Sequence, residues 1–386
     1  MSEGGFSHWK PLDFGAGGIT GSVDADGRII ALNCYDSAHG YVTLTSAQPF
    51  PDADRYDAQK VRAYRRSLAL LHGFGLACNA EITGHDSKLW DEKLPVVQLR
   101  YADGSSARVR TWGTDLVAVQ QWETTSSSGF LFRGRLSLQR SAYTQLTEGG
   151  VIPAPPRRIK IVTHTDGFTL FNPALRRAAA VVGLPDLSGY SFEDGDDVSL
   201  EIPVPSGNIM LFYAFGDSIE DAQSSARAAA RQDAPFQTLF SKNSVELQRR
   251  LYLHASPDRI STRGLIYGHQ MCVPVGEGVC ILTDHMLLPL SWNRDAYFVA
   301  TALLHGVSDG PGLVRRHLIW MFEIAERPNG DWARCYLANG RIKDKAFQLD
   351  QQLYPILELA DYVAKTGDPP AARRRRMRSW SWRSPS

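Results

Sequence analysis

Gly21-Ser-Val-Asp-Ala-Asp-Gly-Arg-Ile-Ile-Ala-Leu32 indicates the fold of the first half of the chain more clearly than any other stretch. Asp26-Gly27 stands there between two short runs of strand-forming residues. Asp-Gly is a strong two-residue hairpin signal, because glycine takes the positive φ that tight hairpin turns need. Asp103-Gly104 is a second hairpin signal of the same kind further along the chain. Both stretches therefore predict antiparallel strand pairs joined by tight turns.

The same pattern continues from Gly15 to about Asp217, as short β-branched and aromatic runs of alternating polarity separated by Gly, Asp, Ser and Pro. Further strands are expected at residues 96–101, 107–112, 116–122, 129–138, 159–165, 198–202 and 209–214. A chain with many strands and few helices can bury the apolar faces of its strands by packing two sheets against each other. Residues 1–216 are therefore predicted to form an antiparallel β-sandwich domain.

The pattern changes at Asp217, which is followed three residues later by Glu220 in the manner of a capping box. Residues 217–250 are predicted to be linker helices, and residues 236–253 continue in helical style. An irregular stretch containing Gly and Cys is expected up to residue 283. Beyond residue 290 the apolar period approaches 3.6, which indicates helices over 296–304, from Pro311 onward and up to Gly367. Pro355 should delay the regular part of the last helix, because its ring meets the carbonyl of Gln351.

Composition excludes several classes of function. Lys and Arg (42) balance Asp and Glu (41) in the 386 residues, so no charge excess favours nucleic acid or an anionic membrane, and a neutral ligand fits better. Five scattered cysteines without a C-x-x-C pair argue against a disulfide framework and against a structural zinc site, and no metal is expected. A Cys272–Cys280 disulfide is not expected either. No basic segment precedes an apolar run at the start, so the expected location is the cytoplasm. No cofactor is expected.

Three motifs follow one another in the second half: Leu288-Pro-Leu-Ser-Trp-Asn-Arg-Asp-Ala-Tyr-Phe298, Arg327-Pro-Asn-Gly-Asp-Trp-Ala-Arg-Cys-Tyr336 and Phe347-Gln-Leu-Asp-Gln-Gln352. Together they resemble the (α/α)6-barrel glycoside hydrolases of the glucoamylase and glycogen-debranching type. The resemblance implies a β-sandwich followed by an (α/α)6 barrel, here incomplete, within residues 251–368. It also implies that a W-x-R-D segment opens an inner helix and binds the terminal sugar, and Trp292, Arg294 and Asp295 match that segment.

The chemistry of these residue types suits a sugar. Carboxylate and guanidinium groups make bidentate hydrogen bonds to neighbouring hydroxyls, while an aromatic face stacks on the C–H surface of the ring. Trp292 or Trp332 could supply that face. The residues alone leave open another interpretation, in which Arg294 and Asp295 are a helix-start ion pair and the tryptophans belong to the core. The order of the three motifs favours the sugar site.

Glycoside hydrolysis usually needs two carboxyl groups, one acting as acid and one as base. The resemblance implies that Asp350 is a site carboxylate, the candidate catalytic acid, with Gln348 beside it as a binding residue. However, a helix N-terminus stabilises a carboxylate in its charged form, which suits a sugar ligand better than a proton donor. The role of Asp350 therefore stays open. His285 and His317 are expected to be packed histidines rather than metal ligands.

Residues 369–386 are basic and rich in arginine. Three interpretations stay open for them: a nucleic-acid-binding tail, a solvated disordered tail, or an out-of-frame ending, which we favour. About 135 residues after Leu251 are too few for twelve helices, so an open barrel is expected, with low stability or association with another chain.

The predicted function is acid/base hydrolysis, of the inverting kind, at the non-reducing end of an α-linked oligosaccharide, by a chain that truncation could leave inactive. A non-catalytic carbohydrate-binding or interaction protein is the alternative. A polysaccharide lyase fits less well, because lyases usually carry the helical part first.

Overall fold

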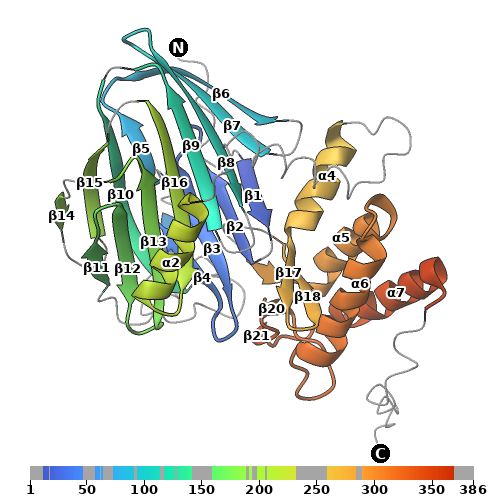
Figure 1. Cartoon of the computed structure of the whole chain (residues 1–386). Coiled ribbons are helices and arrows are strands. Elements are labelled where there is room, and N and C mark those ends of the chain that lie inside the picture. The colour runs from blue at the N-terminus through green and yellow to red at the C-terminus, as the bar shows by residue number, and fades with distance from the viewer. Residues whose placement is uncertain are drawn as a thin grey trace, which may run out of the picture.

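A computed structural model shows a large β-sheet part followed by a smaller helical part (Figure 1). The structure describes residues 12–16, 18–46, 57–60, 62–63, 73–90, 94–113, 117–126, 128–140, 159–187, 191–193, 198–204, 207–231, 259–283 and 289–368. His285, the helical stretch expected at 236–253 and the basic tail lie outside these residues.

Two eight-stranded antiparallel sheets make up the first part, which confirms the predicted β-sandwich. The first runs in the order β1-β2-β3-β4-β10-β15-β14, with β5 also paired to β10. Its strands are β1 (Leu12–Ala16), β2 (Ile19–Val23), β3 (Ile29–Asp36), β4 (Gly40–Thr45), β5 (Gly75–Cys78), β10 (Phe130–Arg140), β14 (Ser191–Glu193) and β15 (Val198–Val204).

The second sheet runs in the order β11-β12-β13-β16-β9-β8-β7-β6. Its strands are β6 (Ile82–Trp90), β7 (Leu94–Tyr101), β8 (Ser106–Gly113), β9 (Val117–Thr124), β11 (Lys160–Thr163), β12 (Gly167–Asn172), β13 (Arg177–Leu184) and β16 (Asn208–Gly216). Residues alternating along the strands of both sheets meet in one core, where Phe132 and Phe168 pack edge to face at 5.4 Å. Strand β13 was not among the predicted strands, because its run of alanine and valine shows no alternation of polar and apolar residues.

The Asp26-Gly27 hairpin was placed correctly, but its turn is longer than two residues. β2 ends at Val23 and β3 begins at Ile29, because the buried Asp24 carboxylate accepts the N–H groups of Asp26 (3.0 Å) and Arg28 (2.8 Å) and so organises a wider turn. Burial raises the pKa of the Asp24 carboxyl. Gly27 has φ +77°, the conformation for which glycine was expected.

Helix α2 (Ile219–Ala230) lies on the outer face of the second sheet and packs there through Ala222 and Ala226. Its cap differs from the prediction. Ser218 is the N-cap, and its Oγ accepts the N–H of Asp221 at 3.1 Å. Asp217 precedes the N-cap and lies 3.2 Å from Arg177.

The second part contains four α-helices among the residues that the structure describes. Its elements are α4 (Arg259–Gln270), β17 (Cys272–Val275), β18 (Gly278–Ile281), β19 (Leu290–Ser291), α5 (Asn293–Gly306), α6 (Gly310–Ile319), the π-helix η3 (Trp320–Ile324), β20 (Cys335–Leu337), β21 (Ile342–Asp344) and α7 (Leu349–Thr366). Helix α4 corrects the expectation of an irregular stretch there. In the described part of the chain, no helix is both long and apolar enough to cross a membrane.

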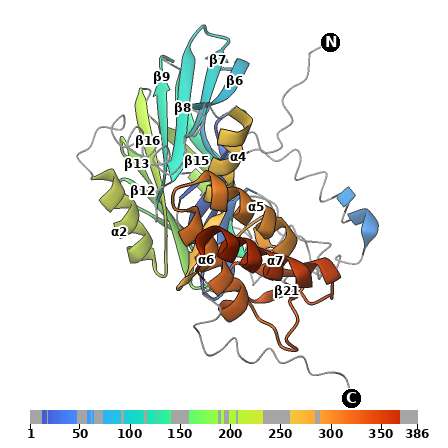
Figure 2. The same ribbon diagram turned by 90° about the vertical axis from the view of Figure 1, so that its right-hand side faces the viewer.

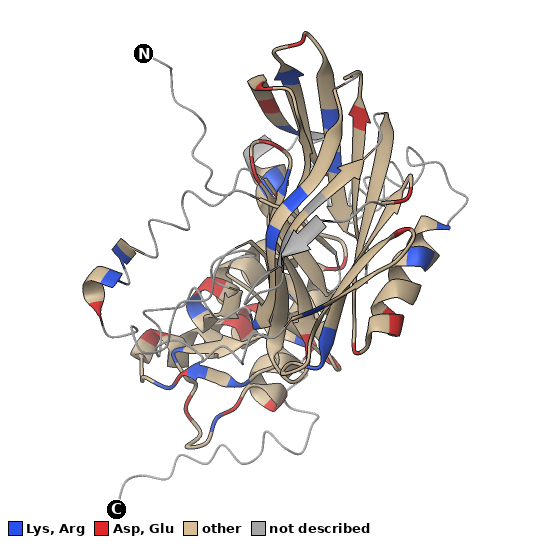
Figure 3. Cartoon of the chain, turned by 90° about the vertical axis from the view of Figure 1, so that its left-hand side faces the viewer, with Lys and Arg blue, Asp and Glu red and all other residues tan. Residues whose placement is uncertain are grey.

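The two parts share apolar and polar contacts. Tyr41 of β4 belongs to the core of the helical part, and Asn339, in the turn between β20 and β21, donates to the Ser37 carbonyl at 2.9 Å. Basic and acidic residues are interspersed over both parts in Figure 3, in keeping with the balanced charge of the sequence.

Strands β17 and β18 place the two nearby cysteines out of reach of each other. Cys272 pairs with Ile281 and Cys280 pairs with Val273, so the two thiols occupy diagonal positions on opposite faces of the hairpin. Both cysteines are buried and free, and burial raises the pKa of each thiol.

Helix α7 begins six residues before Pro355, so the prediction of a later start was wrong. A proline provides no N–H for the Gln351 carbonyl one turn earlier. Asn293 of α5 replaces that donor, because its Nδ2 lies 2.9 Å from the Gln351 carbonyl oxygen. A contact from another helix therefore makes the proline tolerable.

Candidate functional site

The W-x-R-D segment lies at the start of α5, as the resemblance implies. Trp292 is the N-cap residue with an extended backbone (φ −110°, ψ 131°), and Asn293, Arg294 and Asp295 form the first turn. Trp292 and Asn293 point into the interior, whereas the Arg294 and Asp295 side chains are 47% and 41% exposed. This first turn therefore presents one cation and one anion to solvent.

The N-terminus of α7 lies beside that turn and brings in Asp350. Arg294 Nη1 lies 3.0 Å from Asp350 Oδ2, and Arg294 Nη2 lies 3.7 Å from Asp295 Oδ2. One guanidinium thus lies between two carboxylates, each in the first turn of a helix, where the backbone N–H groups favour negative charge. Because all three side chains are more than a third exposed, these pairs contribute little to folding. Their groups stay accessible to a ligand.

A buried pair of amides joins the two helices behind the charged groups. Asn293 is 1% exposed and Gln351 is fully buried. Besides the bond from Asn293 to the Gln351 carbonyl, the Gln351 Oε1 accepts the backbone N–H of Arg294 at 3.3 Å. The other amide atoms, Asn293 Oδ1 and Gln351 Nε2, have no hydrogen-bond partner in the described ranges. These contacts set the position of Arg294 relative to Asp350.

Both tryptophans proposed to stack on a sugar lie in the interior. Trp292 is 8% exposed and packs with Leu290 and Cys335. Trp332 is 2% exposed, and its Nε1 donates to the Met321 carbonyl at 3.1 Å. The ring of Trp332 therefore has almost no free surface, and Trp292 has little.

The backbone of Trp332 is tied to the start of α7 by one glutamine. Gln352 accepts the Trp332 N–H at 2.8 Å and donates to the Trp332 carbonyl at 2.7 Å. The same Nε2 reaches the carbonyl of Gln348, the N-cap residue of α7, at 3.3 Å. Gln348 itself is half-buried. The third motif thus forms the edge of the site and holds the second motif against it.

Three aromatic side chains that the sequence analysis did not single out lie one turn further along the two helices. Phe298 follows Arg294 by four residues and Tyr354 follows Asp350 by four, and their ring centroids are 5.7 Å apart. Tyr297 completes the group at 5.3 Å from Phe298 and 5.1 Å from Tyr354. Phe298 is 58% exposed. The i, i+4 spacing from the charged residues was the signal that could have found them.

A buried titratable pair lies elsewhere in the described helical part. His317 Nδ1 lies 2.8 Å from Glu358 Oε1, and both side chains are almost fully buried. This confirms the prediction that His317 is a packed histidine. No group of three or more His, Cys, Asp or Glu side chains in the described ranges is placed to hold a metal ion.

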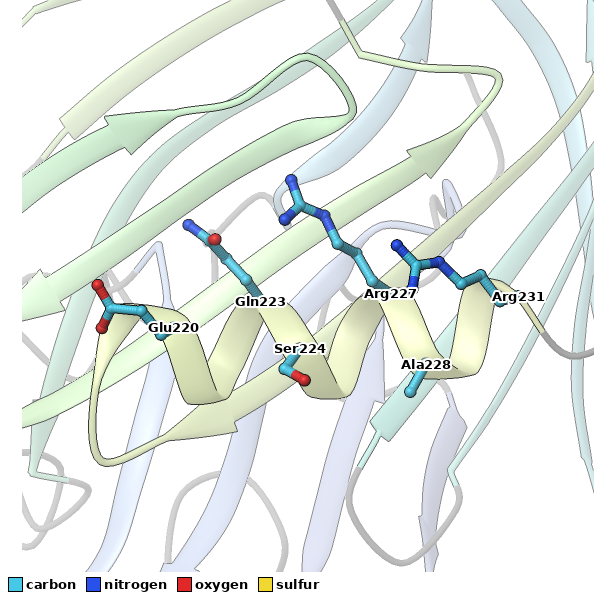
Figure 4. A pocket seen from close by; sticks show the side chains of 6 residues that line it. All are labelled: Glu220, Gln223, Ser224, Arg227, Ala228 and Arg231. Atoms are coloured by element: carbon cyan, nitrogen blue, oxygen red, sulfur yellow. The ribbon is translucent and has the colours of Figure 1, made fainter.

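A separate surface hollow lies along α2, on the sandwich (Figure 4). Its lining residues are Glu220, Gln223, Ser224, Arg227, Ala228 and Arg231, all from one helix. Arg227 makes a bidentate pair with Asp166 at 2.7 and 2.8 Å, and this hydrogen bonding lowers the pKa of the Asp166 carboxyl. Because the hollow is open and lined by one helix, it does not compete with the site between α5 and α7.

Comparison with known proteins gives a fold but no sequence relative. No family model matches the sequence, and no curated protein matches it. Among solved structures, a bacterial glucoamylase in complex with acarbose has a TM-score of 0.63 at 11% identity, over 95% of this chain and 58% of that one. The chain has a glucoamylase-like fold.

Two further solved structures have lower TM-scores. A putative kojibiose phosphorylase from the human microbiome has a TM-score of 0.44 at 8% identity, over 92% of this chain and 52% of that one. A family GH92 alpha-mannosidase from Bacteroides thetaiotaomicron has a TM-score of 0.48 at 10% identity, over 95% and 54%. The chain therefore spans little more than half the length of each of these proteins. The glucoamylase-like fold confirms the predicted β-sandwich followed by part of a helical barrel.

Proposed function

We propose that the chain binds the non-reducing end of an α-linked oligosaccharide at the N-termini of α5 and α7. The observation that carries the proposal is the accessible Arg294 between Asp295 and Asp350, with Phe298 and Tyr354 one turn away. A guanidinium and two carboxylates can donate to and accept from neighbouring hydroxyls, and an exposed ring can pack on the C–H face of a sugar.

Within this proposal the remaining predicted residues position the site. Trp292 fixes the start of α5, while Gln348 and the backbone of Trp332 hold the edge through Gln352. We assign the stacking role to Phe298 in place of the two tryptophans, because the indole rings are buried and the Phe298 ring is exposed. We also propose the division into a sandwich (1–216), a linker (217–250), a partial helical domain (251–368) and a basic tail (369–386).

The reaction that we propose is inverting acid/base hydrolysis. Asp350 suits the role of a sugar ligand better than that of the acid, because it lies in the first turn of α7. Asp295 likewise lies in the first turn of a helix, α5, where its charged form is favoured. This favours the second candidate, a carbohydrate-binding protein without turnover.

One experiment separates the two functions. Short α-glucans and α-mannans are offered to the chain, and binding is followed by calorimetry while released sugar is measured in parallel. Turnover that is lost in Arg294→Ala supports the hydrolase. Binding without turnover, also lost in Arg294→Ala, supports the binding protein, and the absence of both contradicts the site.

A further inference from the structure

Helix α7 is apolar on a face that packs against nothing in the described structure. Its buried side carries Gln351, Pro355, Glu358 and Tyr362. The opposite side carries an exposed stripe, whose members recur every three, four or seven residues and therefore share one side of the helix. The stripe consists of Leu349 (66% exposed), Leu353 (49%), Ile356 (45%), Leu357 (47%) and the exposed Ala360 and Ala364.

This stripe holds most of the exposed large apolar side chains of the described residues. Seven such side chains are more than a third exposed, and four of them belong to the stripe. Phe298 and Phe347 lie on α5 and just before α7, and only Leu184 belongs to the sandwich. Helix α7 also lies at the outer edge of the molecule in Figure 1 and in front of α5 and α6 in Figure 2. A contiguous apolar surface of this kind marks an interaction site.

The stripe is complementary to itself when two copies run antiparallel. With a two-fold axis passing between Ile356 and Leu357, Ile356 of one copy faces Leu357 of the other. In the same register Leu353 faces Ala360 and Leu349 faces Ala364, so each large side chain at the ends meets a small one. Such alternation lets side chains of two helices interdigitate.

We propose that the stripe of α7 pairs antiparallel with the same stripe of a second copy of this chain. A two-fold axis makes one surface sufficient for both partners, which is the commonest symmetry of oligomers. Charge agrees with this register, because Asp350 (39% exposed) of one copy comes near the exposed Lys365 of the other on the same flank of the seam. The apolar pairing does not depend on sugar binding, although Asp350 lies beside both surfaces.

The competing occupant is polypeptide of the same molecule, which would cover the stripe within one chain. A chain whose stripe is covered in that way stays monomeric, whereas a chain that pairs through the stripe has twice the mass.

The test uses the whole 386-residue chain in sedimentation equilibrium over a concentration series. The expected mass is twice the 42.8 kDa of one chain. Leu353→Glu and Ile356→Glu should each raise the dimer dissociation constant about ten-fold or more, since a buried unpaired charge is costly. Leu184→Glu, at the exposed leucine of the sandwich, should leave it unchanged. A monomer at all concentrations, or equal effects of all three substitutions, overturns the proposal.

The register is tested by disulfide formation. Positions 349 and 364 lie about 22 Å apart along one helix at about 1.5 Å per residue, too far for a bond within one chain. The double variant Leu349→Cys/Ala364→Cys should form a covalent dimer on mild oxidation, whereas Leu349→Cys alone should not. Equal cross-linking of the single variant would indicate a parallel pair and overturn the antiparallel register.

Discussion

Asn293→Ala tests the buried amide that holds the two helices of the site together. The substitution removes the Nδ2 donor that lies 2.9 Å from the Gln351 carbonyl. Pro355 cannot replace that donor, and Gln351 is fully buried, so the carbonyl stays unpaired. Because Asn293 Oδ1 has no partner in the described structure, this one bond dominates the change. Leaving one buried polar group unsatisfied costs about 1–3 kcal/mol of unfolding free energy.

The assay is urea denaturation followed by the helical circular dichroism signal, with the midpoint and slope compared between variants. Asn339→Ala is the matched control, since Asn339 makes a bond of the same length to the Ser37 carbonyl at an exposed position. It should cost less than about 0.5 kcal/mol, as surface substitutions usually do.

A double-mutant cycle identifies the cause. Pro355→Ala restores an N–H to the Gln351 carbonyl, so Asn293→Ala should cost about 1 kcal/mol less in that background than in the wild type. An equal cost in both backgrounds, or a cost no larger than that of Asn339→Ala, would refute the argument that Asn293 replaces the donor lost at the proline.

Three further results are expected. Arg294→Lys should weaken sugar binding about ten-fold with unchanged stability, because an ammonium cannot reproduce the planar bidentate contact of a guanidinium. Calorimetry measures the affinity, and wild-type affinity in this variant would contradict the proposed sugar site. Trp332→Phe should lower the unfolding free energy by about 1 kcal/mol through loss of the bond to Met321 but leave sugar affinity intact; weaker binding would mean that the indole meets the ligand. Asp166→Asn should destabilise the chain at neutral pH, and the difference in unfolding free energy should disappear as the pH falls below about 4. The reason is that hydrogen bonding to Arg227 lowers the pKa of Asp166 in the folded state, and this stabilisation is lost when the carboxylate is protonated. A difference that persists in acid would contradict this.

The fold was largely predictable because its determinants are local. Alternation of apolar residues defines most strands, and glycines at positive φ mark turns such as the one at Gly27. Two of the errors have different causes. Helix α7 continues through Pro355 because Asn293, from another helix, supplies a donor. The turn after β2 is widened by a contact within the turn itself, where the buried Asp24 carboxylate accepts the Arg28 N–H.

The sequence by itself determined that Arg294 and Asp295 share the first turn of a helix, since neighbours along a helix are positioned by its geometry. Only the tertiary structure decided that Asp350, 56 residues away from Arg294, meets it, because that contact depends on the packing of α5 against α7. It also decided that the Trp332 ring is buried while Phe298 stays exposed. Burial depends on which elements cover a side chain, and two aromatic residues of similar apolarity are equally suited to a core or to a binding surface.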